Sequence, residues 1–410
     1  MHGARTHLRA LSSAATAAGA AGSPGGNSRP GCSRIRPPLL LGPPAAAVSS
    51  SRPFGAAYTD VSEFLLGDVA VGVLLMESNG AFEPESEDWD PAEVAVQLAG
   101  IVDGMDFWTL RSSGWTRILL RVVSPAITGY EPIRHVSDDE LLFTEEVLGR
   151  LGFHYSGPWG AHYLAMHRLM RDFSTQWAGL YFVADSSNDL DGAFADGYSD
   201  YDYFGGPQVM TTSTHGGDGA IHTQTYAAHE FAHLFYADDE YYSARVPCTS
   251  RSGYLGIQNQ NSDFGSCLLR IDCIMKDGYL PATDSCDYSL DQAGFEDADG
   301  DGIPTILDTQ PLAELLLQPS KIYGRATVQP LPNQNPWSTN GSVMSINTIE
   351  GMVWRLDGGL WKLATPLDGA YDSGMEVVQI PHPGVGPHLI EAVTRNSAGN
   401  LSPVVALTIP

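Results

Sequence analysis

The sequence predicts a mixed α/β domain followed by a small all-β domain. From about residue 58 to residue 295, strand-like apolar runs alternate with helical patterns, which is typical of a layered α/β (α+β) domain with a mixed sheet. From about residue 325 to residue 410, short alternating strands are separated by Gly, Asn and Pro, as in a β-sandwich. At 410 residues, the chain is long enough for both domains.

The elements of the first domain follow from apolar spacing. Continuous apolar runs predict strands, apolar residues at helical spacing predict helices, and the Asp-Pro pair at residues 90–91 indicates a helix start. The predicted strands are Asp68–Ser78, Thr116–Ser124 and Trp177–Asp185, and the predicted helices are Asp90–Leu110, 138–153 and 162–173. In the second domain, MEVVQI and HLIEAVT are clear strand patterns, and Trp354 and Trp361 are expected in the core.

Residues 1–57 differ in composition from the rest of the chain. They contain six arginines, no acidic residue, and mainly Ala, Gly, Ser and Pro. This composition predicts a disordered leader, or a start codon assigned too far upstream. An export segment is the alternative, because PPLLLGPPAAAVSSS follows basic residues and ends in small ones.

The net charge of −26 limits the partners. An acidic surface repels nucleic acid and anionic lipid, so neither is expected to bind. No stretch approaches the ~18 apolar residues of a transmembrane helix, so no membrane span is expected. A monomer is expected.

Four cysteines fall within 39 residues of a loop-rich stretch. They predict two disulfides, with three possible pairings, and therefore a secreted or cell-surface protein. A structural zinc site is the rival interpretation, although no C-x-x-C pair is present. The four are Cys248, Cys267, Cys273 and Cys286, while Cys32 is left over in the leader.

The stretch TYAAHEFAHLF contains the pattern H-E-x-x-H. On a helix, His229 and His233 lie one turn apart on the same face, so both imidazoles can reach one Zn²⁺. Glu230 then borders the open position, where it can take a proton from water and pass it to a leaving amine. A helix that merely happens to carry two histidines is the alternative.

A zinc site of this kind needs a third protein ligand. His222 lies seven residues before His229, a helical rise of ~10 Å, which is too far for a ligand held at ~2 Å. Asp239 can reach the metal only if the helix ends near Phe235 and the chain folds back.

The residues HEFAHLFYADD, followed 42 positions after His233 by Met275 in DCIMKDG, resemble the metzincin clan of zinc endopeptidases. The resemblance covers about residues 60–310 and is similar to secreted bacterial members. It implies a metzincin-like fold with an active-site helix, Asp239 as third ligand, Met275 in the Met-turn, and a bonded cysteine in that turn. It also implies a protein or peptide substrate.

The chain departs from the clan pattern at Tyr236, where a glycine is expected. A tyrosine here either adopts φ > 0 at a cost of ~1–2 kcal/mol, or the turn takes another shape and Glu240 coordinates instead. An inert relic of a peptidase site is the third alternative.

The linker 296–310 contains DADGDGIPTILD. Its acidic positions and its central glycine have the spacing of a calcium loop, and the aspartate at position 12 resembles thrombospondin type-3 repeats. A solvated acidic linker is the alternative. The expected Ca²⁺ ligands are Asp297, Asp299, Asp301 and Asp308, with the carbonyl oxygen of Ile303.

The residues after about 325 resemble the immunoglobulin-like modules of bacterial secreted proteins. Together, these features predict a secreted zinc endopeptidase with Glu230 as general base. The alternative is a catalytically inert, calcium-stiffened extracellular binding protein.

Overall fold

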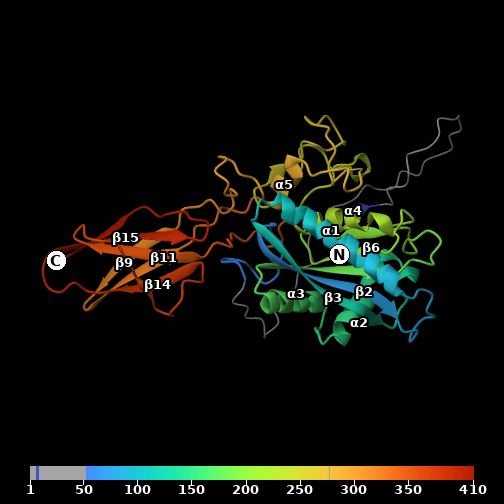
Figure 1. Ribbon diagram of the computed structural model, residues 1–410, viewed down its shortest axis with the longest axis horizontal. Helices are drawn as coiled ribbons and strands as arrows, with labels where there is room; N and C mark the ends of the chain where they lie inside the picture. The colour runs from blue at the N-terminus through green and yellow to red at the C-terminus, as the bar shows by residue number, and fades with distance from the viewer. Residues whose placement is uncertain (1–5, 9–51, 277) are drawn as a thin grey trace. The chain divides into compact units, whose positions relative to one another are not determined.

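The computed structural model describes residues 6–8, 52–276 and 278–410 (Figure 1). The chain divides into two compact units. The first contains Tyr58–Phe295 and Gln334–Gly341, together with the strand Thr6–Leu8. The second contains Arg52–Ala57, Glu296–Asn333 and Ser342–Pro410.

The first unit is built on a mixed six-stranded sheet with the order β1-β5-β6-β4-β2-β3. The strands from β6 to β3 run parallel, while β5 is antiparallel to β6 and to β1. Because helices cover both faces, the central strand β4 is buried along its whole length. The strands are β1 (Thr6–Leu8), β2 (Gly67–Ser78), β3 (Thr116–Thr128), β4 (Trp177–Ala184), β5 (Asp200–Asp202) and β6 (Gln208–Thr212).

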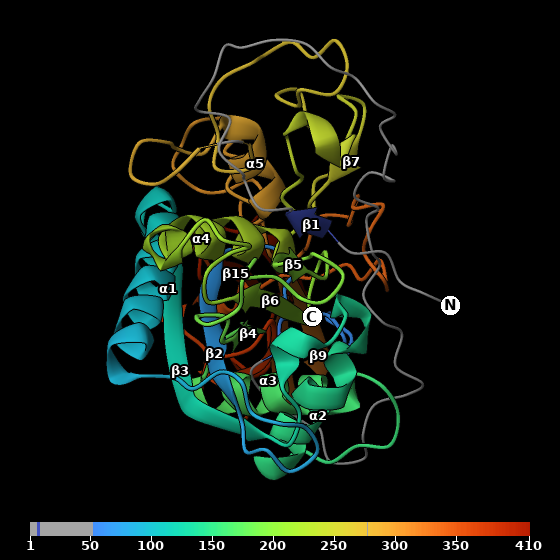
Figure 2. The same ribbon diagram turned by 90° about the vertical axis from the view of Figure 1, so that its right-hand side faces the viewer.

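Helices lie on both faces of this sheet, with α1 and α4 on one face and α2 and α3 on the other (Figures 1 and 2). The mixed α/β class predicted from the sequence is therefore confirmed. The unit also contains a two-stranded ribbon and short 3-10 helices. The helices are α1 (Pro91–Arg111), α2 (Glu140–Arg150), α3 (Gly160–Phe173), α4 (Thr223–Leu234) and α5 (Asp287–Ala293); the ribbon is β7 (Arg251–Ser252) and β8 (Ile257–Gln258); the 3-10 helices are Pro132–Arg134, Ser137–Asp139, Ala220–His222 and Tyr242–Ala244.

The Asp-Pro helix start is confirmed at α1. The Asp90 carboxylate accepts hydrogen bonds from the backbone N–H groups of Ala92 and Glu93, and the Glu93 carboxylate accepts one from the N–H of Asp90. This reciprocal capping box satisfies N–H groups that the first turn of a helix leaves without partners.

A segment from far along the chain completes the first unit. In Gln334–Gly341, the indole N–H of Trp337 donates to the Arg251 carbonyl at 3.1 Å, and its ring meets Phe204 edge-on at 5.9 Å. The Asn340 amide donates to the carboxylate of Asp60 at 2.6 Å. The predicted boundary at residue 295 therefore does not enclose every residue that packs in this unit.

The second unit consists of two four-stranded antiparallel sheets around one apolar core, so the predicted all-β domain is confirmed at this level. Trp354 is buried in it as expected, whereas Trp361 is 41% exposed, with Arg355 over its ring, so its expected core position is wrong. One sheet contains β9 (Leu312–Gln318), β10 (Lys321–Thr327), β13 (Thr365–Pro366) and β14 (Met375–Ile380), and the other β11 (Ile349–Leu356), β12 (Lys362–Leu363), β15 (His388–Asn396) and β16 (Val405–Ile409).

Most of the expected leader 1–57, including Cys32, lies outside the described residues. Within it, Thr6–Leu8 pairs with β5, and Phe54 forms a β-bridge with Ser345 of the second unit. Among the helices of the described chain, none combines the length and apolar character needed to cross a membrane.

Candidate metal centre

Helix α4 carries the H-E-x-x-H pattern and is held close to α1. Two glycines of α1, Gly100 and Gly104, permit this approach: a Cβ atom on Gly104 would lie 2.8 Å from the Cβ of Ala227. The Trp108 indole N–H donates to the carbonyl of Ala228 at 2.8 Å. Close packing to α1 therefore fixes the helix immediately before its first histidine.

His229 and His233 lie on one face of α4, as predicted, with ring centroids 4.8 Å apart. The Nδ1 of His229 is 2.7 Å from the Ile274 carbonyl oxygen, and that of His233 is 2.7 Å from the Ala237 carbonyl oxygen. Since a carbonyl only accepts, each Nδ1 carries the proton and donates. These bonds orient both Nε2 atoms toward a common point, as the outer partners of metal-binding histidines do.

The helix ends at Leu234, and the chain then folds back. Tyr236 has φ = 66°, in the left-handed region, and its N–H donates to the carbonyl of His233 at 3.0 Å. The reversal brings Asp239 Oδ1 to 3.0 Å from His229 Nε2 and 3.2 Å from His233 Nε2. The structure thus unites the two histidines with Asp239.

Tyr236 occupies this turn because a neighbouring glycine makes room for it. A Cβ atom on Gly205 would lie 2.3 Å from Cζ of the tyrosine. The buried ring packs edge-on against Phe204, with centroids 5.3 Å apart. Burial of the ring offsets the ~1–2 kcal/mol cost of a left-handed side-chain residue.

Glu240, the alternative third ligand, lies elsewhere. Its carboxylate accepts hydrogen bonds from the Asn261 amide at 2.7 Å and the Cys286 thiol at 3.0 Å. Consecutive residues of an extended segment point in opposite directions, so only one of this acidic pair faces the histidines. The alternative in which Glu240 replaces Asp239 is therefore wrong for this structure.

The turn containing Met275 supports the centre through its backbone carbonyl groups. Ile274 supplies the carbonyl that orients His229, and Met275, fully buried, accepts the Glu240 N–H at 2.8 Å. His222 is not part of the centre: it precedes α4 and stacks on Tyr279, with centroids 3.9 Å apart.

Glu230 is buried beside the centre together with an acid that the sequence analysis missed. Asp202, at the end of β5, lies with Glu230 and His233 in one cluster. Burial, followed by the charge of Asp202, raises the pKa of Glu230 well above its ordinary value. In the sequence, the acidic stretch DYD (Asp200–Asp202) shortly before Gly205 and Gly206 could have marked Asp202 as a candidate. However, nothing in its spacing connects it to α4.

The electrostatic field of the buried carboxylates around His233 favours a positive charge at its imidazole. Burial lowers the pKa of His233, but the charges of Asp202 and Asp239 more than compensate and raise it to about 9. The other carboxylate oxygen of Asp239, Oδ2, is buried without a hydrogen bond. The two Nε2 atoms lie 3.0 and 3.2 Å from Asp239 Oδ1, and loss of the His233 proton leaves three donor atoms for a metal. A zinc ion fits this donor set.

The predicted calcium loop brings three of its acids together. Asp297, Asp299 and Asp301 form one exposed cluster. The Asp297 carboxylate accepts the N–H groups of Gly300 and Gly302, both at 2.9 Å. The other two expected ligand residues make backbone hydrogen bonds. The Ile303 N–H donates to Asp301 Oδ1 at 2.8 Å, and the Asp308 N–H donates to the Pro304 carbonyl at 3.0 Å.

The cysteines form one disulfide among the described residues, between Cys248 and Cys267. In the described chain the expected second disulfide does not form: Cys273 and Cys286 are free, buried thiols. The hydroxyl of Ser289 lies 3.2 Å from the first sulfur and 3.3 Å from the second. The hydrogen bond from Cys273 lowers the pKa of the Cys286 thiol to about 5.

The sequence and the structure were compared with protein families, curated proteins and solved structures. No family model and no curated protein matches the chain. Among solved structures, a superoxide reductase in the oxidised state is 10% identical, covers 25% of this chain and 88% of its own, and has a TM-score of 0.16. Two reduced-form structures of the superoxide reductase (neelaredoxin) from Archaeoglobus fulgidus, one of them of a single-substitution variant, are 14% identical, cover 25% of this chain and 89–90% of their own, and also have a TM-score of 0.16. Such scores carry no argument about fold or function.

Proposed function

We propose that the chain is a secreted zinc endopeptidase of metzincin type. The observation that carries this proposal is the convergence of His229, His233 and Asp239 beside a buried Glu230. Two neutral imidazoles and a carboxylate are a ligand set of catalytic zinc sites, which retain one position for water or substrate.

Each residue has a role in peptide hydrolysis. The zinc ion, when bound, would supply a Lewis acid that lowers the pKa of water and polarises a peptide carbonyl. His229, His233 and Asp239 would hold it, and the carbonyls of Ile274 and Ala237 fix the imidazole rings. Glu230 would take the proton from the attacking water and deliver it to the leaving nitrogen.

The test compares Glu230→Gln with the full-length wild type, using metal analysis and hydrolysis of a denatured protein substrate. We expect the variant to retain zinc and to lose activity by roughly 10²–10⁴-fold, the contribution of a general base. Asp106→Asn, at an exposed acid of α1, is the control and should leave activity unchanged. Equal activity of Glu230→Gln and wild type would contradict the proposal.

A second candidate function has one observation in its favour. His229, Glu230 and His233 are each at most 2% exposed, whereas a peptidase must admit a peptide. A catalytically inert, calcium-stiffened extracellular binding protein on a peptidase scaffold would need no such access. Zinc binding without cleavage of any denatured substrate would favour this candidate.

We also propose a Ca²⁺ site in the loop of Asp297, Asp299 and Asp301. The support is the loop spacing together with the three converging carboxylates. Calcium should raise the unfolding temperature of the wild type in calorimetry, and Asp301→Asn should reduce that rise. A wild-type unfolding temperature that does not respond to calcium would contradict the site.

Secretion is proposed from the Cys248–Cys267 disulfide, which persists in oxidising compartments. The net charge of −26 supports a protein or peptide substrate over nucleic acid as partner.

A further inference from the structure

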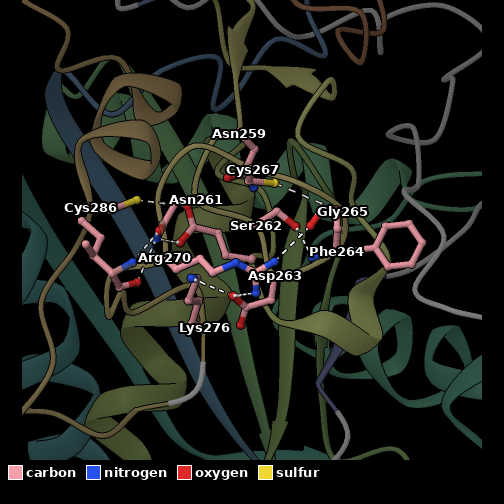
Figure 3. A network of polar contacts seen from close by, with 12 residues as sticks. Asn259, Asn261, Ser262, Asp263, Phe264, Gly265, Cys267, Arg270, Lys276 and Cys286 are labelled. Atoms are coloured by element: carbon pink, nitrogen blue, oxygen red, sulfur yellow. Dashed lines mark hydrogen bonds and ion pairs between the residues drawn. The ribbon is translucent and has the colours of Figure 1, made fainter.

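A second cluster of metal-ligating side chains lies next to the first. Glu240, Cys273 and Cys286 place a carboxylate oxygen and two sulfur atoms within 4.8 Å of one another. The hydroxyl of Ser289 lies 3.2–3.3 Å from all three. Figure 3 shows Cys286 and Asn261 within the polar network of this region.

The cluster is closed to solvent and has no internal counter-charge. Glu240, Cys273 and Ser289 are fully buried, and Cys286 is 2% exposed. All three titratable groups become negative on losing a proton. Within the described chain, no Lys, Arg or His side chain forms a hydrogen bond or ion pair with them; Lys276, for example, pairs with Asp263 at 3.1 Å.

Each sulfur atom accepts a backbone N–H group, and the Cys286 thiol also donates to Glu240 Oε1 at 3.0 Å. Cys273 Sγ accepts the backbone N–H of Cys286 at 3.2 Å, and Cys286 Sγ accepts that of Ser289 at 3.5 Å. Thiolate sulfur is a far better acceptor than a thiol or a disulfide, because it carries the charge. Hydrogen bonds to sulfur are among the outer interactions that tune metal-bound thiolates.

We propose that Cys273, Cys286 and Glu240, with Ser289 at the fourth position, bind a second metal ion of the thiolate-seeking class, such as Zn²⁺. Donors around one tetrahedral ion lie roughly 3.3–3.7 Å apart. Four of the six donor–donor contacts here are 3.0–3.3 Å, and the two from Cys273 Sγ to Cys286 Sγ and to Glu240 are within 4.8 Å, so small side-chain shifts would accommodate the ion. Both cysteines bind as thiolates, any thiol proton still present is released to solvent, and no electron is transferred.

The ion would stabilise the first centre through two backbone connections. Glu240 follows Asp239 directly, and Cys273 precedes Ile274, whose carbonyl oxygen orients His229. A metal joining Glu240 to Cys273 therefore ties together the two segments that place the third ligand and the first histidine. A closed site of this kind is structural, because it leaves no position for substrate.

Cobalt substitution tests the proposal on the full-length chain, purified without reductant or chelator. Thiolate ligation gives Co²⁺ a sulfur-to-metal charge-transfer band in the near ultraviolet, which histidine and aspartate do not produce. We expect this band in the wild type and in the double variant His229→Ala/His233→Ala, which lacks the first centre. Cys273→Ser and Cys286→Ser should each lose it.

If the cysteine variants fail to fold, the accessibility of the two thiols to an alkylating reagent in the wild-type protein provides the test. The two cysteines should resist alkylation in the metal-loaded protein and react after chelation, and zinc analysis should find one ion beyond that of the first centre. A peptide joined by a Cys273–Cys286 disulfide would overturn the proposal. So would a wild-type protein without the charge-transfer band, whatever its peptidase activity.

Discussion

Replacing Tyr236 by glycine restores the residue of the clan pattern, yet we expect it to destabilise the first unit. Truncating a buried aromatic side chain costs ~3–5 kcal/mol, and the ring is 1% exposed and packed on Phe204. Relief of the left-handed conformation returns ~1–2 kcal/mol. The net loss should be roughly 1–4 kcal/mol.

Hydrogen exchange of peptides from α4 measures this loss for the first unit alone, because exchange reports the free energy of local and global opening. Gly205→Ala is the companion change, since its Cβ would strike the tyrosine ring at 2.3 Å. In the Tyr236→Gly background that clash disappears, so the two losses should be less than additive by at least about 1 kcal/mol. A Tyr236→Gly variant as stable as wild type, or strictly additive losses, would refute the reasoning.

Two further predictions concern single acids. Asp239→Asn should weaken zinc binding by at least about tenfold in a competition titration, whereas Asp238→Asn, at the neighbouring acid that contacts Gln292, should not; equal losses would contradict the assignment of Asp239. Burial raises the pKa of Glu77 from 4.5 to about 7, so the native state keeps a proton that the unfolded chain releases, and stability should fall as pH rises from 4.5 through 7. Glu77→Gln should flatten this part of the urea-unfolding profile, and an unchanged profile would assign the slope to other groups.

Local patterns in the sequence predicted most of the first unit. The strand Asp68–Ser78 and the helix Asp90–Leu110 each agree with the structure to within one residue, because their apolar spacing and cap are short-range signals. The return of the chain to Asp239 depended on one backbone angle, and Tyr236 has the required positive φ.

The missed features depend on contacts between distant segments. Asp202 approaches His233 only because β5 pairs with β6 along the edge of the sheet. The free thiols of Cys273 and Cys286 could not be distinguished from a disulfide by spacing, since Ser289 and Glu240 contact them only in the folded chain. The room for Tyr236 likewise depends on Gly205, 31 positions earlier in the sequence.

The segment Gln334–Gly341 has a consequence for how the protein is made. It belongs to the first unit, but β9 and β10 of the second unit precede it in the chain. During synthesis, the ribosome therefore releases two strands of the β-sandwich before Trp337 can reach Phe204. The first unit cannot finish folding before the second has begun to emerge, and a fragment that stops at residue 295 would lack the indole that covers this ring.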